Sequence, residues 1–175
     1  MEIPFGDWVL RPWRRGDEPS LVRYANNPKV AAQLRDLFPH PYTPADAHAW
    51  VERAGGQPEP RTNLAIAAAD EAIGGVGIVV LPDIGRRSAE IGYWLGEPFW
   101  GRGIATQAVQ AMSRYAFERF DLVRLFAVVF EGNPASCRVL EKAGYSFEGR
   151  LRMAATKNGR TFDLLSYGLV REDRR

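Results

Sequence analysis

A glycine-containing loop between a strand-like segment and a long amphipathic helix is the feature that most restricts the fold of this chain. The strand-like run covers 89–95, the loop covers 100–106, and apolar residues at helical spacing predict a helix from Gly103 to about Phe120. Glycine lets the backbone come close to a ligand. The first amides of a helix have no partner within the helix and lie at the positive end of its dipole. The loop is therefore suited to a phosphate or pyrophosphate group.

Alternating strand and helix patterns surround this loop. The predicted strands are Trp8–Arg11, Leu64–Ala69, Ile73–Leu81, Ser88–Leu95, Arg124–Phe130, Tyr145–Met153 and Phe162–Val170. The predicted helices run from a cap at Asp17 to Asn27, weakly over Pro28–Arg35, from Thr43 to Gly55, from Gly103 to Phe120 and from Asn133 to Gly144. The nearly all-apolar run 124–130 is typical of a central strand covered on both faces. We therefore expect a mixed α/β sandwich with helices on both sides of the sheet.

Size and composition exclude several classes of protein. The 175 residues predict one domain, 1–175, and a net charge of +2 gives no strong reason to expect direct nucleic-acid binding. No apolar run approaches the roughly 20 residues of a membrane span. The single cysteine and the absence of a signal-peptide core favour a cytoplasmic protein. Two basic clusters are expected to be solvated faces: Arg11, Arg14 and Arg15, and Arg171, Arg174 and Arg175.

Several motifs together resemble the GCN5-related N-acetyltransferase (GNAT) superfamily. Its pyrophosphate loop carries the signature [Gln/Arg]-x-x-Gly-x-[Gly/Ala], which this chain matches at Gly103 and Ala105 but not at Trp100. The closer resemblance is to the RimJ/RimL-like branch, which acetylates the N-termini of ribosomal proteins. Five stretches carry it: Leu10–Pro12, Pro41–Thr43 with Asp46–Ala47, Ala89–Leu95, Asn133–Ser136 and Leu140–Tyr145.

This resemblance implies a mostly antiparallel sheet with splayed middle strands and acetyl-CoA as co-substrate. In the family the strand corresponding to 88–95 bulges, and its opened backbone holds the pantetheine arm and polarises the thioester. The amides of 102–106 would bind the pyrophosphate. The residues expected to contact coenzyme A are Tyr93, Trp94, Leu95, Trp100, Gly101, Arg102, Gly103, Ile104, Ala105, Thr106, Asn133, Ser136, Arg138 and Lys142.

Two residues are candidates for proton transfer. Glu90 is a candidate general base, because an ammonium must lose a proton before it attacks a thioester; the alternative is a salt bridge or a role in orienting the acceptor. By resemblance, Ser136 is the candidate general acid for the departing thiolate, and Tyr145 is a weaker one. Asn133 would hold pantetheine, although Asn before Pro is also a good helix cap.

The acceptor is open at this stage. Its wall is expected to come from Trp13, Phe38, Tyr42 and Trp50, with Glu90 and Asp163 as further contacts, unless the aromatic residues only pack in the core. The acceptor would be a protein or peptide N-terminus, such as that of a ribosomal protein. The alternatives are a small amine, such as an aminoglycoside, a polyamine or an amino-acid derivative, or a module that binds acyl-CoA without turnover.

Other chemistries are not favoured by the sequence. Thr106 stands where a Rossmann loop needs its third glycine, and no Gly-Lys-Ser/Thr follows, although a nucleotide-phosphate binder remains an alternative. His40, His48 and Cys137 are too few and too scattered for a metal site. We expect no metal and no membrane partner, and exposed late strands make a homodimer an open alternative.

Overall fold

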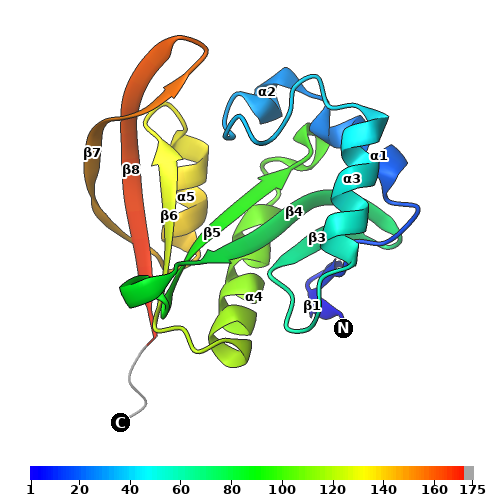
Figure 1. Ribbon diagram of the computed structural model, residues 1–175, viewed down its shortest axis with the longest axis horizontal. Coiled ribbons are helices and arrows are strands. Elements are labelled where there is room, and N and C mark those ends of the chain that lie inside the picture. The colour runs from blue at the N-terminus through cyan, green and yellow to red at the C-terminus, as the bar shows by residue number, and fades with distance from the viewer. Residues whose placement is uncertain (172–175) are drawn as a thin grey trace.

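Eight strands form one sheet in the order β1-β2-β3-β4-β5-β6-β8-β7 in the computed structural model, which describes residues 1–171 (Figure 1). The strands are β1 (Ile3–Phe5), β2 (Trp8–Arg11), β3 (Asn63–Ala68), β4 (Glu71–Val80), β5 (Ser88–Leu95), β6 (Arg124–Phe130), β7 (Ser146–Lys157) and β8 (Arg160–Val170). Neighbouring strands are antiparallel except β5 and β6, which run parallel. The predicted mixed, mostly antiparallel α/β fold is confirmed.

Helices cover both faces of this sheet. They are α1 (Glu18–Ala25), α2 (Pro28–Ala31), α3 (Pro44–Gly55), α4 (Ile104–Arg119) and α5 (Pro134–Lys142), with short 3-10 turns η1 (Asp83–Gly85) and η2 (Glu97–Phe99). One hydrophobic cluster packs α4 and α5 against the sheet, and a second packs α1 and α3 against its other face. Alternate residues of β5 divide between them, because Ala89 and Ile91 join the first cluster and Trp94 joins the second. Among the described residues, no helix is both long and apolar enough to cross a bilayer.

The helix ends that matter for the site follow from local sequence signals. Gly103 precedes α4 with φ +75°, a left-handed conformation that glycine adopts without steric cost. Asn133 caps α5, because its Oδ1 accepts a hydrogen bond from the Ser136 N–H at 3.2 Å. Both helices begin next to the middle strands of the sheet, and both starts were predicted.

Pairing between the two middle strands is short. β5 and β6 pair only at Ser88↔Arg124, Ala89↔Leu125 and Glu90↔Phe126. Beyond these pairs β5 continues against β4 as far as Leu95, and β6 continues against β8 as far as Phe130. The two strands therefore diverge toward their C-terminal ends, and the sheet opens in its middle (Figure 1). The splayed strands expected from the family resemblance are present.

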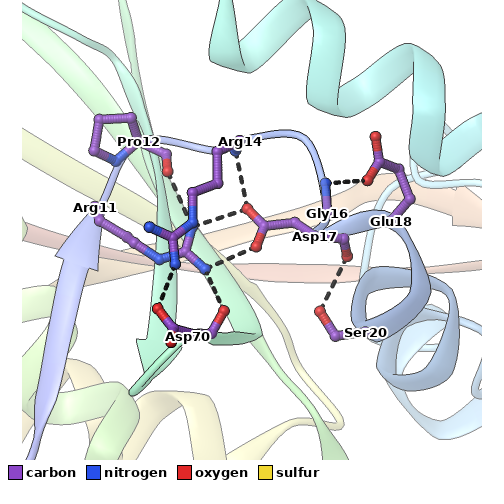
Figure 2. Close-up of polar contacts among 8 residues, drawn as sticks. All are labelled: Arg11, Pro12, Arg14, Gly16, Asp17, Glu18, Ser20 and Asp70. Atoms are coloured by element: carbon purple, nitrogen blue, oxygen red, sulfur yellow. Dashed lines mark hydrogen bonds and ion pairs between the residues drawn. The ribbon is translucent and has the colours of Figure 1, made fainter.

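A buried ion pair fixes the corner where β2 leads into α1 (Figure 2). Arg11 and Asp17 are each 2% exposed, and two hydrogen bonds of 2.8 and 2.7 Å join the guanidinium to both carboxylate oxygens. The Asp17 carboxylate also accepts the Arg14 N–H at 2.9 Å, and Arg11 donates to the Asp70 carbonyl at 3.0 Å. The corner thereby joins β2, α1 and the β3–β4 turn.

Two sequence predictions at this corner are wrong for the same reason. Arg11 does not belong to a solvated face, because it is buried against Asp17. Asp17 stands at the N-cap position of α1 without a side-chain capping bond, because its carboxylate is occupied by Arg11 and the Arg14 N–H. Arg174 and Arg175 lie outside the described residues.

Several elements differ from the prediction. Strand β1 was not predicted, and β4 begins at Glu71 rather than at Ile73. The weakly predicted helix 28–35 ends at Ala31. The last two strands are longer than expected, because β7 extends to Lys157 and β8 begins at Arg160 around a tight turn. Asn158 and Gly159 form this turn at φ +51° and +74°, a conformation that Asn and Gly adopt more readily than other residues.

Candidate active site

A cleft of about 1490 Å³ passes through the opening between β5 and β6. This volume exceeds the roughly 300–1,000 Å³ of a single small-molecule pocket, so it has room for two substrates. Most residues predicted from sequence line it: Trp13, Phe38, Tyr42, Trp50, Glu90, Tyr93, Trp94, Leu95, Trp100, Gly101, Gly103, Ile104, Ala105, Thr106, Asn133, Ser136, Arg138 and Lys142. Two others, Arg102 and Asp163, do not.

The backbone of β5 points polar groups into this opening. Leu81 N–H donates to the Ser88 carbonyl at 3.0 Å, and Gly96 N–H donates to the Ile73 carbonyl at 2.8 Å, so the even-numbered residues of β5 bond to the β4 side. Since alternate residues of a strand bond to opposite neighbours, the odd-numbered residues face β6. Tyr93 therefore directs its N–H and C=O into the cleft, where no strand pairs with it.

The register of β5 contains no bulge, contrary to the expectation from the family resemblance. Its pairing with β4 runs without a shift from Gly74↔Leu95 to Val80↔Ala89. The irregularity in this half of the sheet lies instead between β3 and β4, at Ile66 and Ala67. The opening arises because β6 turns away from β5, and not from a distortion of β5.

The glycine loop lies at the end of the cleft where α4 begins. Gly101 and Gly103 adopt φ +73° and +75°. Among the described residues, the N–H groups of 101–103 donate no hydrogen bond, and those of 104–106 form the first turn of α4, where a helix offers no internal acceptor. A row of amides at the positive end of a 16-residue helix is therefore available to an anionic group.

Trp100, which departs from the family signature, ties this loop to β5. Its indole Nε1 donates a 2.7 Å hydrogen bond to the Leu95 carbonyl, which would otherwise lie unpaired at the end of the strand. Its own backbone N–H donates to the Glu97 carbonyl at 3.1 Å. Trp100 thus positions the loop, and its amide is not available to a ligand.

Ser136 and Tyr93 face each other across the cleft, from the first turn of α5 and from β5. Their hydroxyl oxygens are 2.7 Å apart, and the Tyr93 hydroxyl also lies 3.3 Å from the Ser136 carbonyl. Burial raises the pKa of the Tyr93 phenol well above its ordinary value, so the phenol stays protonated. Sequence analysis assigned Tyr93 only a backbone role and missed this hydroxyl pair.

Tyr145, the weaker candidate for the acid, lies in the core. It is 3% exposed, does not line the cleft, and its hydroxyl pairs with the Ser113 hydroxyl at 2.8 Å. Burial raises the pKa of Tyr145 to about 12. Ser136, paired with Tyr93, does line the cleft, and its role as the acid stays a prediction.

Glu90 lines the cleft at the point where β5 and β6 separate. Its carboxylate Oε1 forms an ion pair with Arg35, which belongs to the segment between α2 and α3. The Glu90 side chain is 21% exposed. Both alternatives from the sequence are therefore still open, since a salt bridge exists and the carboxylate also lies at the cleft.

Aromatic side chains line the part of the cleft between the sheet and the α1–α3 face. Trp13 and Tyr42 are 2% and 5% exposed and belong to the core, whereas Phe38, Trp50 and Trp94 are only partly buried. Phe38 contacts Trp94 and Tyr42, with ring centroids 5.5 and 5.1 Å apart. These residues line the cleft and also pack in the second cluster, so core packing is confirmed and the acceptor wall stays a prediction.

The two predicted residues that do not line the cleft have other partners. Arg102 stacks on the Trp8 ring, with its guanidinium carbon 5.2 Å from the ring centroid. Asp163 pairs with Arg150 at 2.8 Å and accepts the Met153 N–H at 2.9 Å. Of the three cationic residues expected to contact coenzyme A, Arg138 and Lys142 of α5 line the cleft and Arg102 does not. Within residues 1–171, no group of three or more His, Cys, Asp and Glu side chains is arranged to hold a metal ion.

Comparison with known proteins gives consistent results. Residues 8–146 match the family model described as acetyltransferase (GNAT) domain. The uncharacterized N-acetyltransferase YoaA of Bacillus subtilis (strain 168) is 39% identical over 101 residues, which is 58% of this chain and 56% of YoaA. The ribosomal-protein-serine acetyltransferase of Escherichia coli (strain K12) is 33% identical over 101 residues, again 58% of this chain and 56% of that protein. The chain thus spans little more than half the length of these relatives.

Structural comparison extends the similarity over nearly the whole chain. The solved structure of RimL, the ribosomal L7/L12 alpha-N-protein acetyltransferase in complex with coenzyme A, has a TM-score of 0.80 at 24% identity. The match covers 97% of this chain and 98% of that chain. At this level of identity the comparison shows a shared fold.

Proposed function

This chain belongs to the GNAT acetyltransferase family, and on that premise we propose that it is an N-acetyltransferase that moves the acetyl group of acetyl-CoA directly to a primary amine. The observation that carries the proposal is the opening between β5 and β6, with free amides of the glycine loop at one end and a carboxylate at the other. The acceptor that we propose is a protein N-terminus, which the similarity to a ribosomal-protein-serine acetyltransferase supports.

Each end of the cleft suits one part of the reaction. The amides of 103–106 and the cations of Arg138 and Lys142 would bind the phosphates of coenzyme A. The Tyr93 N–H, directed into the opening, would stabilise the negative charge that develops on the thioester oxygen. These groups require no metal ion for binding or for charge stabilisation.

Glu90 and Ser136, at the opening, would carry out the proton transfers. The ammonium of the acceptor loses a proton to Glu90, directly or through water, and its nitrogen then attacks the thioester carbonyl carbon. The C–S bond breaks, and the departing thiolate takes a proton from Ser136, whose hydroxyl is held by the Tyr93 phenol. The attacking nitrogen loses its second proton to the Ser136 oxygen, and Glu90 returns the first proton to water. The products are an amide and coenzyme A.

The binding step can be tested with one charge placed in the first turn of α4. Glutamate at the third helical position is favourable for the helix, so Thr106→Glu preserves the fold while it repels the pyrophosphate. Calorimetric titration with coenzyme A is expected to show an affinity at least tenfold lower. Gln107→Glu is the matched control, since Gln107 is exposed and does not line the cleft, and we expect a change below threefold.

Turnover is tested by thiol release from acetyl-CoA with peptides and small amines, and by mass spectrometry of the products. Unchanged coenzyme A affinity in Thr106→Glu would refute the binding mode. Tight binding with no acetylated amine would favour a module that binds acyl-CoA without turnover. Stronger binding of ATP than of coenzyme A would favour a nucleotide-phosphate binder.

A further inference from the structure

A gap in the side chains of β5 lies between the candidate base and the aromatic wall. Glu90, Gly92 and Trp94 share the face of β5 that looks toward α1 and α3, and all three line the cleft. Gly92 is exposed, and a Cβ added to it would meet no atom within 4 Å. Strand residues rise about 3.4 Å each, so the backbone positions of Glu90 and Trp94 are about 14 Å apart along β5. The space over Gly92, between the Glu90 carboxylate and the Trp94 indole, is open.

Gly75, on β4 next to this gap, is closely packed, whereas Gly92 is open. A Cβ at Gly75 would lie 2.9 Å from Nε1 of Trp94 and 3.1 Å from Cζ2 of Trp13. The two indoles are therefore packed directly on the backbone of β4. Gly75 is required by the packing of the wall, whereas Gly92 leaves room that no part of the protein fills.

The far end of the gap is aromatic. Trp94 and Phe38 meet with centroids 5.5 Å apart at 63°, and Trp13 meets Trp50 at 6.1 Å and 83°. Phe38, Trp50 and Trp94 are only partly buried and line the cleft, so their rings are available to an occupant.

We propose that the acceptor is an α-amino compound with an aromatic side chain, either the N-terminal residue of a peptide or a free amino-acid derivative. This inference rests on the proposed acetyl transfer. The amine lies at Glu90, the α-carbon passes over Gly92, and the ring packs against Trp94 and Phe38. A ring of this kind gains edge-to-face contacts that a small side chain such as that of alanine lacks.

A side chain at position 92 would fill the gap over β5 without a clash. Gly92→Val adds a side chain where nothing is contacted, at an ordinary strand φ. The matched control is Gly132→Val, which also meets no atom within 4 Å and does not line the cleft. The acceptors are phenylalaninamide, alaninamide and tripeptide amides beginning with phenylalanine or alanine. Acetylation is followed by thiol release, and binding by calorimetric titration into the coenzyme A complex.

We expect kcat/KM to be at least tenfold higher for phenylalanine than for alanine in one or both series, and the better series identifies a free or peptide source. Gly92→Val is expected to lower kcat/KM for the phenylalanine acceptor at least 100-fold while the coenzyme A affinity stays within twofold. Gly132→Val should change both by less than twofold. Equal or better use of alanine, or full activity of Gly92→Val, would overturn the inference and leave the acetyl transfer intact. Selective binding of phenylalaninamide with no acetylation of any amine would instead overturn the proposed function alone.

Discussion

Replacing Asp17 with asparagine should be among the most destabilising polar substitutions in this protein. The side chain keeps its shape, but the Arg11 guanidinium then remains buried at 2% exposure with no counter-charge. Removing one partner of a buried ion pair costs about 3–5 kcal/mol. A domain of this size has a free energy of unfolding of about 5–15 kcal/mol, so the loss is a large fraction of the total. Asparagine cannot replace both of the charge-assisted hydrogen bonds, of 2.8 and 2.7 Å, that Asp17 accepts from Arg11.

Urea denaturation followed by circular dichroism measures this effect. With a denaturant slope of about 2 kcal/mol/M, Asp17→Asn is expected to lower the midpoint by about 1.5–2.5 M. Asp70→Asn is the matched control in the same corner, because the Asp70 side chain is 98% exposed and pairs with Arg14 at 2.7 Å (Figure 2). Exposed pairs contribute at most about 1 kcal/mol.

A second variant separates the loss of a charge partner from the loss of packing. Arg11→Met with Asp17→Leu replaces both charges by apolar side chains, and such replacements are often neutral or stabilising. The double variant should therefore be more stable than Asp17→Asn alone. If Asp17→Asn and Asp70→Asn shifted the midpoint equally, the argument that burial makes this pair indispensable would be refuted.

Three further predictions concern hydroxyl groups, two at the cleft and one in the core. Ser136→Ala should lower kcat by about 10²–10⁴-fold if its hydroxyl is the general acid. Tyr93→Phe should lower kcat less, with no change in the alkaline limb of the pH–rate profile below pH 10, because burial keeps the phenol protonated there; an alkaline limb that disappears in this variant would contradict that view. The raised pKa of about 12 for Tyr145 means that above pH 10 the unfolded chain loses this proton more readily than the folded protein. The free energy of unfolding should therefore fall between pH 10 and 12, by up to roughly 1.4 kcal/mol per pH unit from this group, and Tyr145→Phe should reduce that slope; identical slopes in urea titrations would disprove it.

Local sequence signals were sufficient for most elements of the fold. The α4 start at Gly103 and the α5 cap at Asn133 depend on residues next to one another, so a sequence reading detects them. Hydrophobic periodicity predicted β5 and β6 within their observed bounds. The family resemblance, rather than any local pattern, supplied the opening between these strands.

The contacts that the sequence did not specify depend on the folded geometry, whatever the separation of the partners along the chain. Arg11 is buried because tertiary packing brings it to Asp17, whereas its local surroundings are those of an ordinary basic patch. Glu90 is paired with Arg35, 55 residues away, which no spacing rule indicates. The Trp100 indole reaches the Leu95 carbonyl through a turn whose geometry the sequence does not specify.

The divergence of β5 and β6 gives the sheet two inner edges in addition to the outer edges at β1 and β7. Edge strands are normally a hazard, because their unpaired backbone groups recruit strands of other chains. Here the inner edges lie within the cleft, among its side chains and next to the start of α5. The free main-chain groups of β5 are therefore held inside the molecule for a ligand, and not displayed along the rim of the sheet.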